Sequence, residues 1–265
     1  MDGKRSLRSH EIVRTDWGRL NQMRAIILAA GKGSRLDSAF GEAVKCLVKL
    51  GGMSLIERQI GCLRSAAIDD ITVVVGFQAE RVRKTCGPEI RFIENTIFAE
   101  TNSLYSLWLA REFISAGFVV MNSDVLFHPQ LLSDLLNASY EDALLVSLRD
   151  DTIYGDEEMK VKIRGGQLVD ISKTMKPDEA DGENLGIAKF GKKGAAILGE
   201  KIDGLIAEGA LQSWAPRAFL EFARARPLHA VATRGLPWIE IDFAEDYRRA
   251  KEHILPLFPQ ASAAP

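Results

Sequence analysis

Short apolar runs alternate with amphipathic segments through the first half of the chain. Apolar or β-branched runs of about four to eight residues bounded by polar residues or glycine are typical of buried strands. The segments that predict strands are residues 25–30, 71–75, 90–94, 117–121 and 143–148. The segments between them that predict helices are residues 55–63, 79–86, 102–113 and 129–137. This alternation of strands and helices predicts a doubly wound, mostly parallel sheet.

The pattern changes after Arg149. Two strand-like segments, residues 160–163 and 168–172, flank Gly165-Gly166, and a two-glycine turn in that position predicts a β-hairpin. The remaining segments predict strands at 185–190, 228–232 and 238–242 and helices at 195–207, 211–225 and 244–254. We therefore expect an α/β fold of the Rossmann-like type, whose mostly parallel sheet carries a β-hairpin insertion.

The two ends of the chain differ in composition from the segment between them. Residues 1–22 are polar and somewhat basic and lack the apolar stretch of a signal peptide, so we expect a flexible extension. Residues 256–265 are small and proline-rich, which predicts a disordered tail. Residues 23–255 contain neither an internal repeat nor a linker rich in Gly, Ser or Pro. The sequence therefore predicts one folded domain.

Composition argues against several classes of partner and site. The 265 residues carry a formal net charge of −2, which gives no electrostatic case for nucleic acid. No apolar run approaches the roughly 20 residues of a transmembrane helix, so we expect no membrane segment. Cys46, Cys62 and Cys86 have neither disulfide-framework nor zinc spacing, and the four histidines are scattered. We expect a cytoplasmic protein in a reducing compartment.

A glycine-rich loop follows the first predicted strand. Gly31-Lys-Gly-Ser34 lets the backbone turn tightly, and Arg35 and Lys45 add positive charge. Exposed N–H groups and fixed cations at a strand end favour phosphate binding. A dinucleotide fingerprint would need a third glycine where Leu36 stands, and a Walker-type loop would need a glycine where Ile26 stands. A glycine turn without a ligand is the remaining alternative.

Two aspartates end predicted strands. Asp124 follows the run 117–121, and Asp242 ends the segment 238–242. Open α/β sheets bind ligands at the carboxyl ends of their strands, and paired carboxylates near a phosphate loop are suited to Mg²⁺. The alternative for each aspartate taken alone is a helix N-cap.

Three further features each have a structural and a functional interpretation. Lys173 ends the second hairpin strand, a position where a lysine is usually solvated. Asn102 and Ser103 enter a predicted helix, either as caps or as donors to a base edge. Trp214 and Trp238 are typical core residues, unless an acceptor that carries an ammonium group needs an aromatic face.

Two motifs resemble those of the nucleotidyltransferase family. Leu28-Ala-Ala-Gly-x-Gly-Ser-Arg-Leu36 is similar to the opening loop of enzymes that activate phosphorylated sugars and alcohols. Asn95 together with residues 101–107 resembles an Asn…Asn-x-x-Tyr-Ser-Leu pattern of the phosphocholine cytidylyltransferase-like branch. Over residues 23–254 the chain resembles this branch most closely, and the resemblance implies a sheet of the GT-A type.

The resemblance also implies roles for individual residues. The implied catalytic cations are Arg35, Lys45 and Lys173, although Val44 replaces the proline that usually precedes the family's phosphate-binding lysine. Asp124 and Asp242 match the two metal aspartates and would hold Mg²⁺. The residues implied to bind the nucleotide are Leu28, Ala29, Ala30, Gly31, Gly33, Ser34, Gly76, Asn102 and Ser103. The residues implied to bind the acceptor are Lys173, Glu183, Gly186 and Trp238.

The implied reaction joins an acceptor phosphate to a nucleoside triphosphate and releases pyrophosphate. We expect CMP transfer from CTP to a small phosphorylated or phosphonylated alcohol, such as phosphocholine, 2-aminoethylphosphonate or an inositol phosphate. The alternatives are a sugar-1-phosphate uridylyl- or guanylyltransferase, a nucleotide-binding regulatory protein without turnover, and a glycosyltransferase. For the last, Asn122-Ser-Asp124 matches an Asp-x-Asp signature only in part. The base, the acceptor and the oligomeric state, a homodimer included, stay open.

Overall fold

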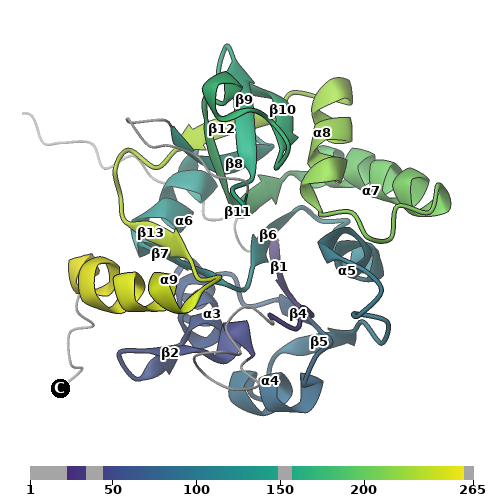
Figure 1. The fold of residues 1–265 in the computed structure, drawn as a ribbon. Helices are drawn as coiled ribbons and strands as arrows, with labels where there is room; N and C mark the ends of the chain where they lie inside the picture. Colours follow the sequence, from purple (N-terminus) through teal and green to yellow (C-terminus); the bar gives the residue numbers. More distant parts are fainter. Residues whose placement is uncertain (1–22, 34–43, 149–156, 260–265) are drawn as a thin grey trace, which may run out of the picture.

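The structure is a computed structural model that describes residues 23–33, 44–148 and 157–259 (Figure 1). In this part of the chain, nine strands form one sheet in the order β5-β4-β1-β6-β11-β8-β12-β10-β9. The strands are β1 Arg24–Ala29, β4 Ile71–Val75, β5 Arg91–Glu94, β6 Phe118–Asn122, β8 Ala143–Leu148, β9 Lys160–Arg164, β10 Gln167–Ser172, β11 Gly182–Phe190 and β12 His229–Ala232. The α-helices are α3 Leu55–Ser65, α4 Ala79–Cys86, α5 Ser103–Leu109, α6 Pro129–Asn137, α7 Lys192–Ala207, α8 Pro216–Ala225 and α9 Ala244–Arg249. Among these described helices, none combines the length and the hydropathy that crossing a bilayer requires.

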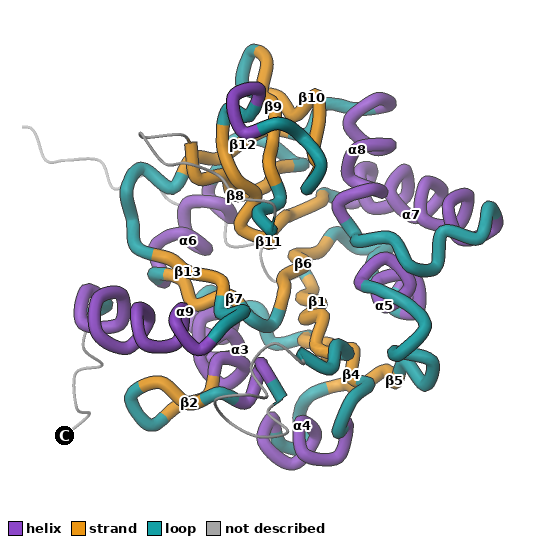
Figure 2. Tube along the Cα trace, viewed as in Figure 1, coloured by secondary structure: helices purple, strands orange, loops and turns teal. Residues whose placement is uncertain are grey.

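The first half of the sheet is parallel and covered on both faces. β1 pairs in parallel with β4 and β6, and β4 pairs in parallel with β5. Successive residues of β1 enter two different cores: Ala25 and Ile27 pack with residues of α3, α4 and α6, whereas Ile26 and Leu28 pack with residues of α5, α7 and α8. Helices therefore flank the strands on both sides (Figure 2), as the alternation of strands and helices predicts.

The second half of the sheet is mixed, so the prediction of a mostly parallel sheet is wrong there. β11 runs antiparallel to β6 and β8, and β10 runs antiparallel to β12 and β9. β9 also pairs with β11, which closes β11, β8, β12, β10 and β9 into a ring. The physical reason is the place where β11 enters: it pairs with β6 only from Ile187 onward, so its first residues extend past the carboxyl end of β6. A strand that enters from that edge runs back against its parallel neighbours.

The hairpin predicted after Arg149 is formed by β9 and β10. Gly165 and Gly166 join the two strands with φ angles of +54° and +77°, which a tight hairpin turn requires and glycine adopts without steric cost. β10 ends at Ser172, opposite Lys160, and Lys160 also pairs with the part of β11 that extends past β6. The hairpin therefore brings the next residue, Lys173, to the edge of the sheet at which β6 ends.

A smaller sheet and the C-terminal helices pack beside this edge. β13 (Trp238–Glu240) pairs with β7 (Val125–Phe127) rather than with the large sheet, and β2 (Lys49–Leu50) pairs with β3 (Met53–Ser54). Contrary to the prediction of a strand over 238–242, β13 ends at Glu240. Residues Ala250–Ile254 continue α9 as a π-helix, and Leu255–Leu257 form a 3₁₀ helix.

The predicted tail and extension are described only in part. The prediction of a disordered tail from Pro256 onward is wrong for its first residues, because they extend the C-terminal helices and Phe258 packs against the cluster that contains Leu50 and Ile241. Residues 1–22, the predicted flexible extension, and residues 260–265 lie outside the described part of the chain.

The helix predicted over residues 211–225 begins only at Pro216. The carbonyls of Leu211 and Ser213 accept hydrogen bonds from the backbone N–H groups of Asn102 and Leu104, at 2.9 and 3.1 Å. These N–H groups belong to the first turn of α5, which has no partners within its own helix. Because the carbonyls of Leu211 and Ser213 pair with α5, they are not available for a helix of their own, and the first carbonyls that serve α8 are those of Trp214 and Ala215.

Candidate active site

Polar residues and glycines gather around a cavity of about 340 Å³ at the carboxyl ends of β1 and β6. The lining residues are Leu28, Ala29, Ala30, Gly31, Gly33, Val44, Lys45, Cys46, Asn95, Phe98, Thr101, Asn102, Ser103, Ser106, Asn122, Ser123, Asp124, Lys173, Trp214, Glu240 and Asp242. Eleven of them were predicted as site residues from the sequence: Leu28, Ala29, Ala30, Gly31, Gly33, Lys45, Asn102, Ser103, Asp124, Lys173 and Asp242. The fold therefore brings most of the predicted site together from widely separated parts of the chain.

Two glycines, Gly33 in the loop after β1 and Gly76 after β4, are needed for close packing around this loop. Gly33 has a φ of +67°, and a Cβ there would lie 2.5 Å from Cγ of Lys45, so glycine leaves room for the lysine side chain. Gly76 stands behind the same loop, where a Cβ would lie 2.7 Å from the carbonyl oxygen of Ala30. Its missing side chain lets the end of β4 approach the loop.

Asp124 and Asp242 come together through the β7–β13 sheet. Asp124 occupies the turn between β6 and β7, and its carbonyl oxygen accepts a hydrogen bond from the N–H of Ile241 at 3.0 Å. One carboxylate oxygen from each of Asp124, Glu240 and Asp242 lies within 4.8 Å of the other two. We call these three residues the acidic cluster.

Neither aspartate of the acidic cluster serves as a helix cap. The N-cap of α6 is His128, whose ring nitrogen accepts from the backbone at 3.1 Å. At the start of α9, the carboxylate of Asp246 accepts hydrogen bonds from the N–H groups of Asp242 and Phe243, at 3.0 and 2.8 Å. The helix-cap interpretation of Asp124 and Asp242 is therefore wrong, and both carboxylates line the cavity.

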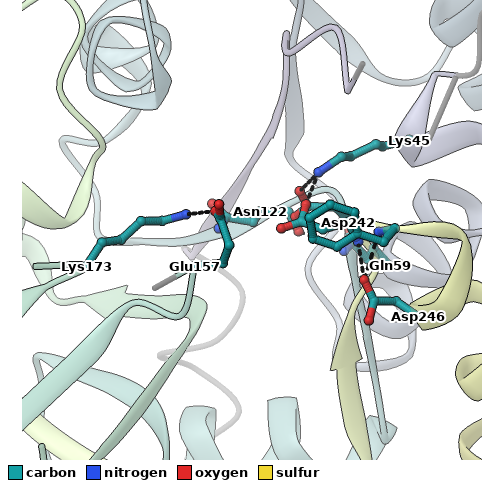
Figure 3. A network of polar contacts seen from close by, with 9 residues as sticks. Lys45, Gln59, Asn122, Glu157, Lys173, Asp242 and Asp246 are labelled. Atoms are coloured by element: carbon teal, nitrogen blue, oxygen red, sulfur yellow. Dashed lines mark hydrogen bonds and ion pairs between the residues drawn. The ribbon is translucent and has the colours of Figure 1, made fainter. Parts of the chain in front are cut away.

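Lys45 neutralises part of the acidic cluster. Its ammonium group forms an ion pair with Asp242 and lies 3.6 Å from Oδ2 of Asp124 (Figure 3). Burial lowers the pKa of Lys45, but the charges of Asp124 and Asp242 more than offset this, so the net pKa is raised and the lysine is charged. Burial raises the pKa of Asp124 against the opposing charge of Lys45. Burial, and then the charges of the two aspartates, raise the pKa of Glu240.

These residues fit a divalent cation. Three partly buried carboxylates face one lysine, so their negative charges can coexist only if protons or a further cation offset them. Oδ1 of Asp124 is buried and has no hydrogen-bond partner among the described residues, which is costly for a carboxylate. Carboxylate oxygens are the ligands that Mg²⁺ prefers, and a cation bound here would satisfy that oxygen.

Lys173 faces the cavity from the side opposite Lys45 (Figure 3). Its ammonium nitrogen lies 3.2 Å from the Glu157 carboxylate and 5.2 Å from the centre of the Trp214 ring. With a side chain only 23 % exposed, it is not the freely solvated lysine that its position at a strand end suggests. The lysine is held in place between an acid and an aromatic face.

Asn102 and Ser103 line the cavity while holding the start of α5 in place. Oδ1 of Asn102 accepts from the N–H of Ser103 at 2.8 Å, and the Ser103 hydroxyl accepts from the N–H of Ala215 at 2.8 Å. Buried Asn95 donates to the hydroxyls of Thr101 and Ser106. The cap interpretation is thus confirmed for Asn102, whereas the Ser103 hydroxyl binds the backbone before α8, and contact of either residue with a nucleotide base stays a prediction.

Several predicted site residues do not line this cavity. Gly76 and Gly186 stand behind it: Gly186 has a φ of +74°, and a Cβ there would lie 2.5 Å from Nδ2 of Asn122, which does line the cavity. Glu183 lies opposite Lys160 in the register of β11 and β9, and Trp238 of β13 is partly buried against the core cluster that contains Ala25 and Ile27. Ser34 and Arg35 lie outside the described residues.

Sequence reasoning missed Glu240 and Asn122. Glu240 stands two positions before Asp242, and the alternation that turns Ile239 and Ile241 to one face turns the two acids to the other. This two-residue alternation could have identified Glu240 from the sequence. Asn122 ends β6 two positions before the predicted metal ligand Asp124, and its only signal in the sequence was the partial match of Asn122-Ser-Asp124 to an Asp-x-Asp signature.

Comparison with known proteins gives a family match and several relatives. Residues 25–189 match the family model described as MobA-like NTP transferase domain. A bifunctional IPC transferase and DIPP synthase from Rubrobacter xylanophilus is 28% identical over 237 residues, which cover 87% of this chain and 52% of the relative. A choline-phosphate cytidylyltransferase from Streptococcus pneumoniae is 32% identical over 140 residues, which cover 51% of this chain and 60% of the relative. The chain thus spans only about half to three fifths of the length of these curated relatives.

Solved structures agree with the fold. A CTP:phosphocholine cytidylyltransferase from Streptococcus pneumoniae matches with a TM-score of 0.70 and 25% identity, covering 87% of this chain and 98% of the other. An inositol-1-phosphate CTP transferase from T. maritima matches with a TM-score of 0.70 and 24% identity, covering 85% and 91%. The second likeness supports the fold alone.

Proposed function

Because the chain belongs to the family of MobA-like NTP transferase domains, we propose that it transfers CMP from CTP to a small phosphorylated or phosphonylated alcohol and releases pyrophosphate. The observation that carries this proposal is one cavity with the acidic cluster and Lys45 on one side and Lys173 on the other. The choice of CTP rests on relatives described as a choline-phosphate cytidylyltransferase and a CMP-5'-(3-aminopropyl)phosphonate synthase.

The proposed reaction requires no side chain to activate the acceptor. A phosphate or phosphonate oxygen is already anionic, so it attacks the α-phosphorus of the nucleotide directly, and the bond from that phosphorus to the pyrophosphate oxygen breaks. What remains for the protein is to align the two anions and to stabilise the charge that moves to the leaving group. This is why the site supports transfer without a Ser–His or Cys–His pair.

The chain's own cations divide this work. Lys45 and the backbone of Gly31 and Gly33 would hold the triphosphate, while Lys173 would hold the acceptor phosphate on the opposite side. Glu157 and Trp214 keep the Lys173 ammonium turned into the cavity. The two lysines thereby bring together anions that would otherwise repel each other.

The acidic cluster, Asp124, Glu240 and Asp242, would hold Mg²⁺. When bound, the ion supplies positive charge beside the phosphates. The chain's part is to keep the three carboxylates together at the carboxyl end of β6, with Lys45 as the competing cation inside the same cluster. Mg²⁺ is therefore part of the proposal.

Pyrophosphate release from the purified protein with Mg²⁺ tests the proposed function. The four common nucleoside triphosphates are crossed with phospho-alcohols, phosphonates and sugar phosphates. We expect turnover with CTP and a phospho-alcohol or phosphonate. We expect the rate of the Asp124→Asn variant to be about 10²–10³-fold lower, which is the usual effect of removing one preorganised electrostatic group.

Other outcomes distinguish the alternatives. Turnover with UTP or GTP and a sugar phosphate would keep the chemistry and replace the base and the acceptor. Absence of pyrophosphate with every combination, while wild type and Asp124→Asn bind CTP equally, would favour a nucleotide-binding regulatory protein. A circular dichroism spectrum like that of wild type is the control that Asp124→Asn is folded.

A further inference from the structure

A buried glutamine outside the cavity contacts the backbone on both sides of Asp124. Gln59 lies on α3, its side chain is only 1% exposed, and Nε2 donates to the carbonyl oxygens of Asn122 at 2.9 Å and Val125 at 3.0 Å (Figure 3). The orientation of the amide is determined by these partners, because the reversed amide would set its oxygen against two carbonyl oxygens. Both amide protons therefore bind the β6–β7 connection.

The two carbonyls that Gln59 holds bracket a short turn, residues 123–124. The turn has two further backbone contacts: Ser123 donates to the Leu28 carbonyl at 3.3 Å, and the Asp124 carbonyl accepts from Ile241 at 3.0 Å. The turn is thus held by α3, by β1 and by Ile241, the residue that follows β13. Of these three contacts, the one from α3 is made by a side chain, so one substitution can remove it while leaving the backbone bonds in place.

A merely structural role explains Gln59 poorly. Neighbouring buried positions of α3, such as Ile56, Ile60 and Leu63, are apolar and pack into the core. Oε1 of Gln59 is buried and has no hydrogen-bond partner among the described residues, so the amide carries a desolvation cost that an apolar side chain of the same length would avoid. The two hydrogen bonds donated by Nε2 offset this desolvation cost.

We propose that Gln59 is a positioning residue that aims the Asp124 carboxylate into the acidic cluster. This inference rests on the proposed function, since it assigns Asp124 the role of a metal ligand. A ligand is effective only when held within about 0.5 Å of its productive geometry, and loss of the group that orients it typically lowers metal affinity by about 10–100-fold. Gln59 acts through the turn and does not line the cavity.

The test compares Gln59→Met, which keeps the length of the side chain and removes both donors, with Leu63→Ala one turn later on α3. Leu63 is buried in the same core and is the control for loss of stability. Binding of Mn²⁺ to the full chain without nucleotide, measured by electron paramagnetic resonance, is the main readout. The Mn²⁺ concentration at half-maximal pyrophosphate release is the second. We expect Gln59→Met to weaken both by about 10–100-fold and Leu63→Ala to change neither.

The outcomes separate this inference from the proposed function. If wild type binds Mn²⁺ and releases pyrophosphate, and Gln59→Met lowers the melting temperature without changing Mn²⁺ binding, Gln59 is an ordinary core residue and the inference is wrong. If wild type neither binds Mn²⁺ nor releases pyrophosphate, the proposed function fails and the inference fails with it. Should Gln59→Met not fold, Gln59→Asn replaces it, because the shorter amide cannot reach both carbonyls and is expected to weaken Mn²⁺ binding in the same way.

Discussion

At the scale of single residues, the cavity depends on side chains that are charged and held in place. Lys173 is fixed by Glu157 and Trp214, and Lys45 by two aspartates. The glycines Gly33 and Gly186 leave room for these side chains, because a Cβ there would clash with Lys45 and Asn122, respectively. Each of these contacts fixes where a polar group lies, which is what alignment of two phosphates requires.

Lys173 and Lys176 form a matched pair for testing acceptor binding. Lys173 lines the cavity, whereas Lys176 is 75% exposed three residues later. We expect Lys173→Ala to lower kcat/KM for the acceptor by about 10²–10³-fold, because it removes a positioned cation, and Lys176→Ala to leave it near the wild-type value. Steady-state kinetics with the acceptor varied at saturating CTP measures this. Equal losses in the two variants would contradict the assignment.

Glu183 makes the stability of the protein depend on pH. Burial, and next the neighbouring charge of Glu158, raise its pKa from 4.5 to about 7. Between these values the folded state keeps a proton that the unfolded state has released, so the free energy of unfolding falls as the pH rises. The Glu183→Gln variant has no such titration. The difference between its melting temperature and that of wild type should therefore rise from about pH 4.5 to 7 and stay constant at higher pH. A difference that does not vary with pH would refute this.

At the scale of elements, short helices and turns hold the site by their ends. The segment 211–215 caps α5, and the N-terminal turn of α9 orients Asp242 through Asp246. The β7–β13 sheet then fixes the distance between the two strand ends that carry the acidic cluster. The ends of elements are therefore where stability and function are coupled in this protein.

The Asp246 cap gives a prediction at this scale. We expect Asp246→Ala to lose about 1 kcal/mol of stability, because it removes the N3 carboxylate that accepts from the N–H groups of Asp242 and Phe243, and also to raise the metal concentration needed for half-maximal activity. Asp246→Asn keeps an oxygen acceptor for the same N–H groups and should stay close to wild type, as should Glu245→Ala, which changes the exposed neighbouring acid. Thermal denaturation and a metal titration measure the two effects. Loss of stability alone would show that the cap does not orient Asp242.

At the scale of the whole molecule, the cavity joins the two halves of the sheet. The loop after β1 and the start of α5 flank the parallel half, whereas Lys173 follows the hairpin strand β10 of the mixed half. A ligand that touches all of these stabilises the folded chain as a unit, because it binds the folded state and not the unfolded one.

A thermal shift assay tests this. With CTP and Mg²⁺ at about 100 times the dissociation constant, linkage gives about 2.7 kcal/mol of stabilisation, which corresponds to a rise of roughly 5–10 °C in melting temperature for a chain of this size. We expect EDTA to remove much of the shift, and Asp124→Asn to show only the shift seen with EDTA. An equal shift with and without metal would contradict a metal-assisted site.

The sequence by itself determined most of the elements and the local part of the site. The glycine loop, Lys45, Asp124 and the Gly165-Gly166 turn could be predicted because short-range patterns of burial, turn geometry and charge specify them. The Ser54 cap of α3, with Glu57 three residues later, was likewise predictable and is present as a capping box.

The tertiary structure alone decided how distant segments meet. The reversed direction of β11, the pairing of β13 with β7, and the support of Asp124 by Gln59 each join residues between about 60 and 120 positions apart. The helix predicted from Leu211 failed for the same reason, because the carbonyls of Leu211 and Ser213 pair with α5 instead. Local periodicity specifies which face of an element is buried, whereas the choice of partner depends on the free energy of packing the whole chain.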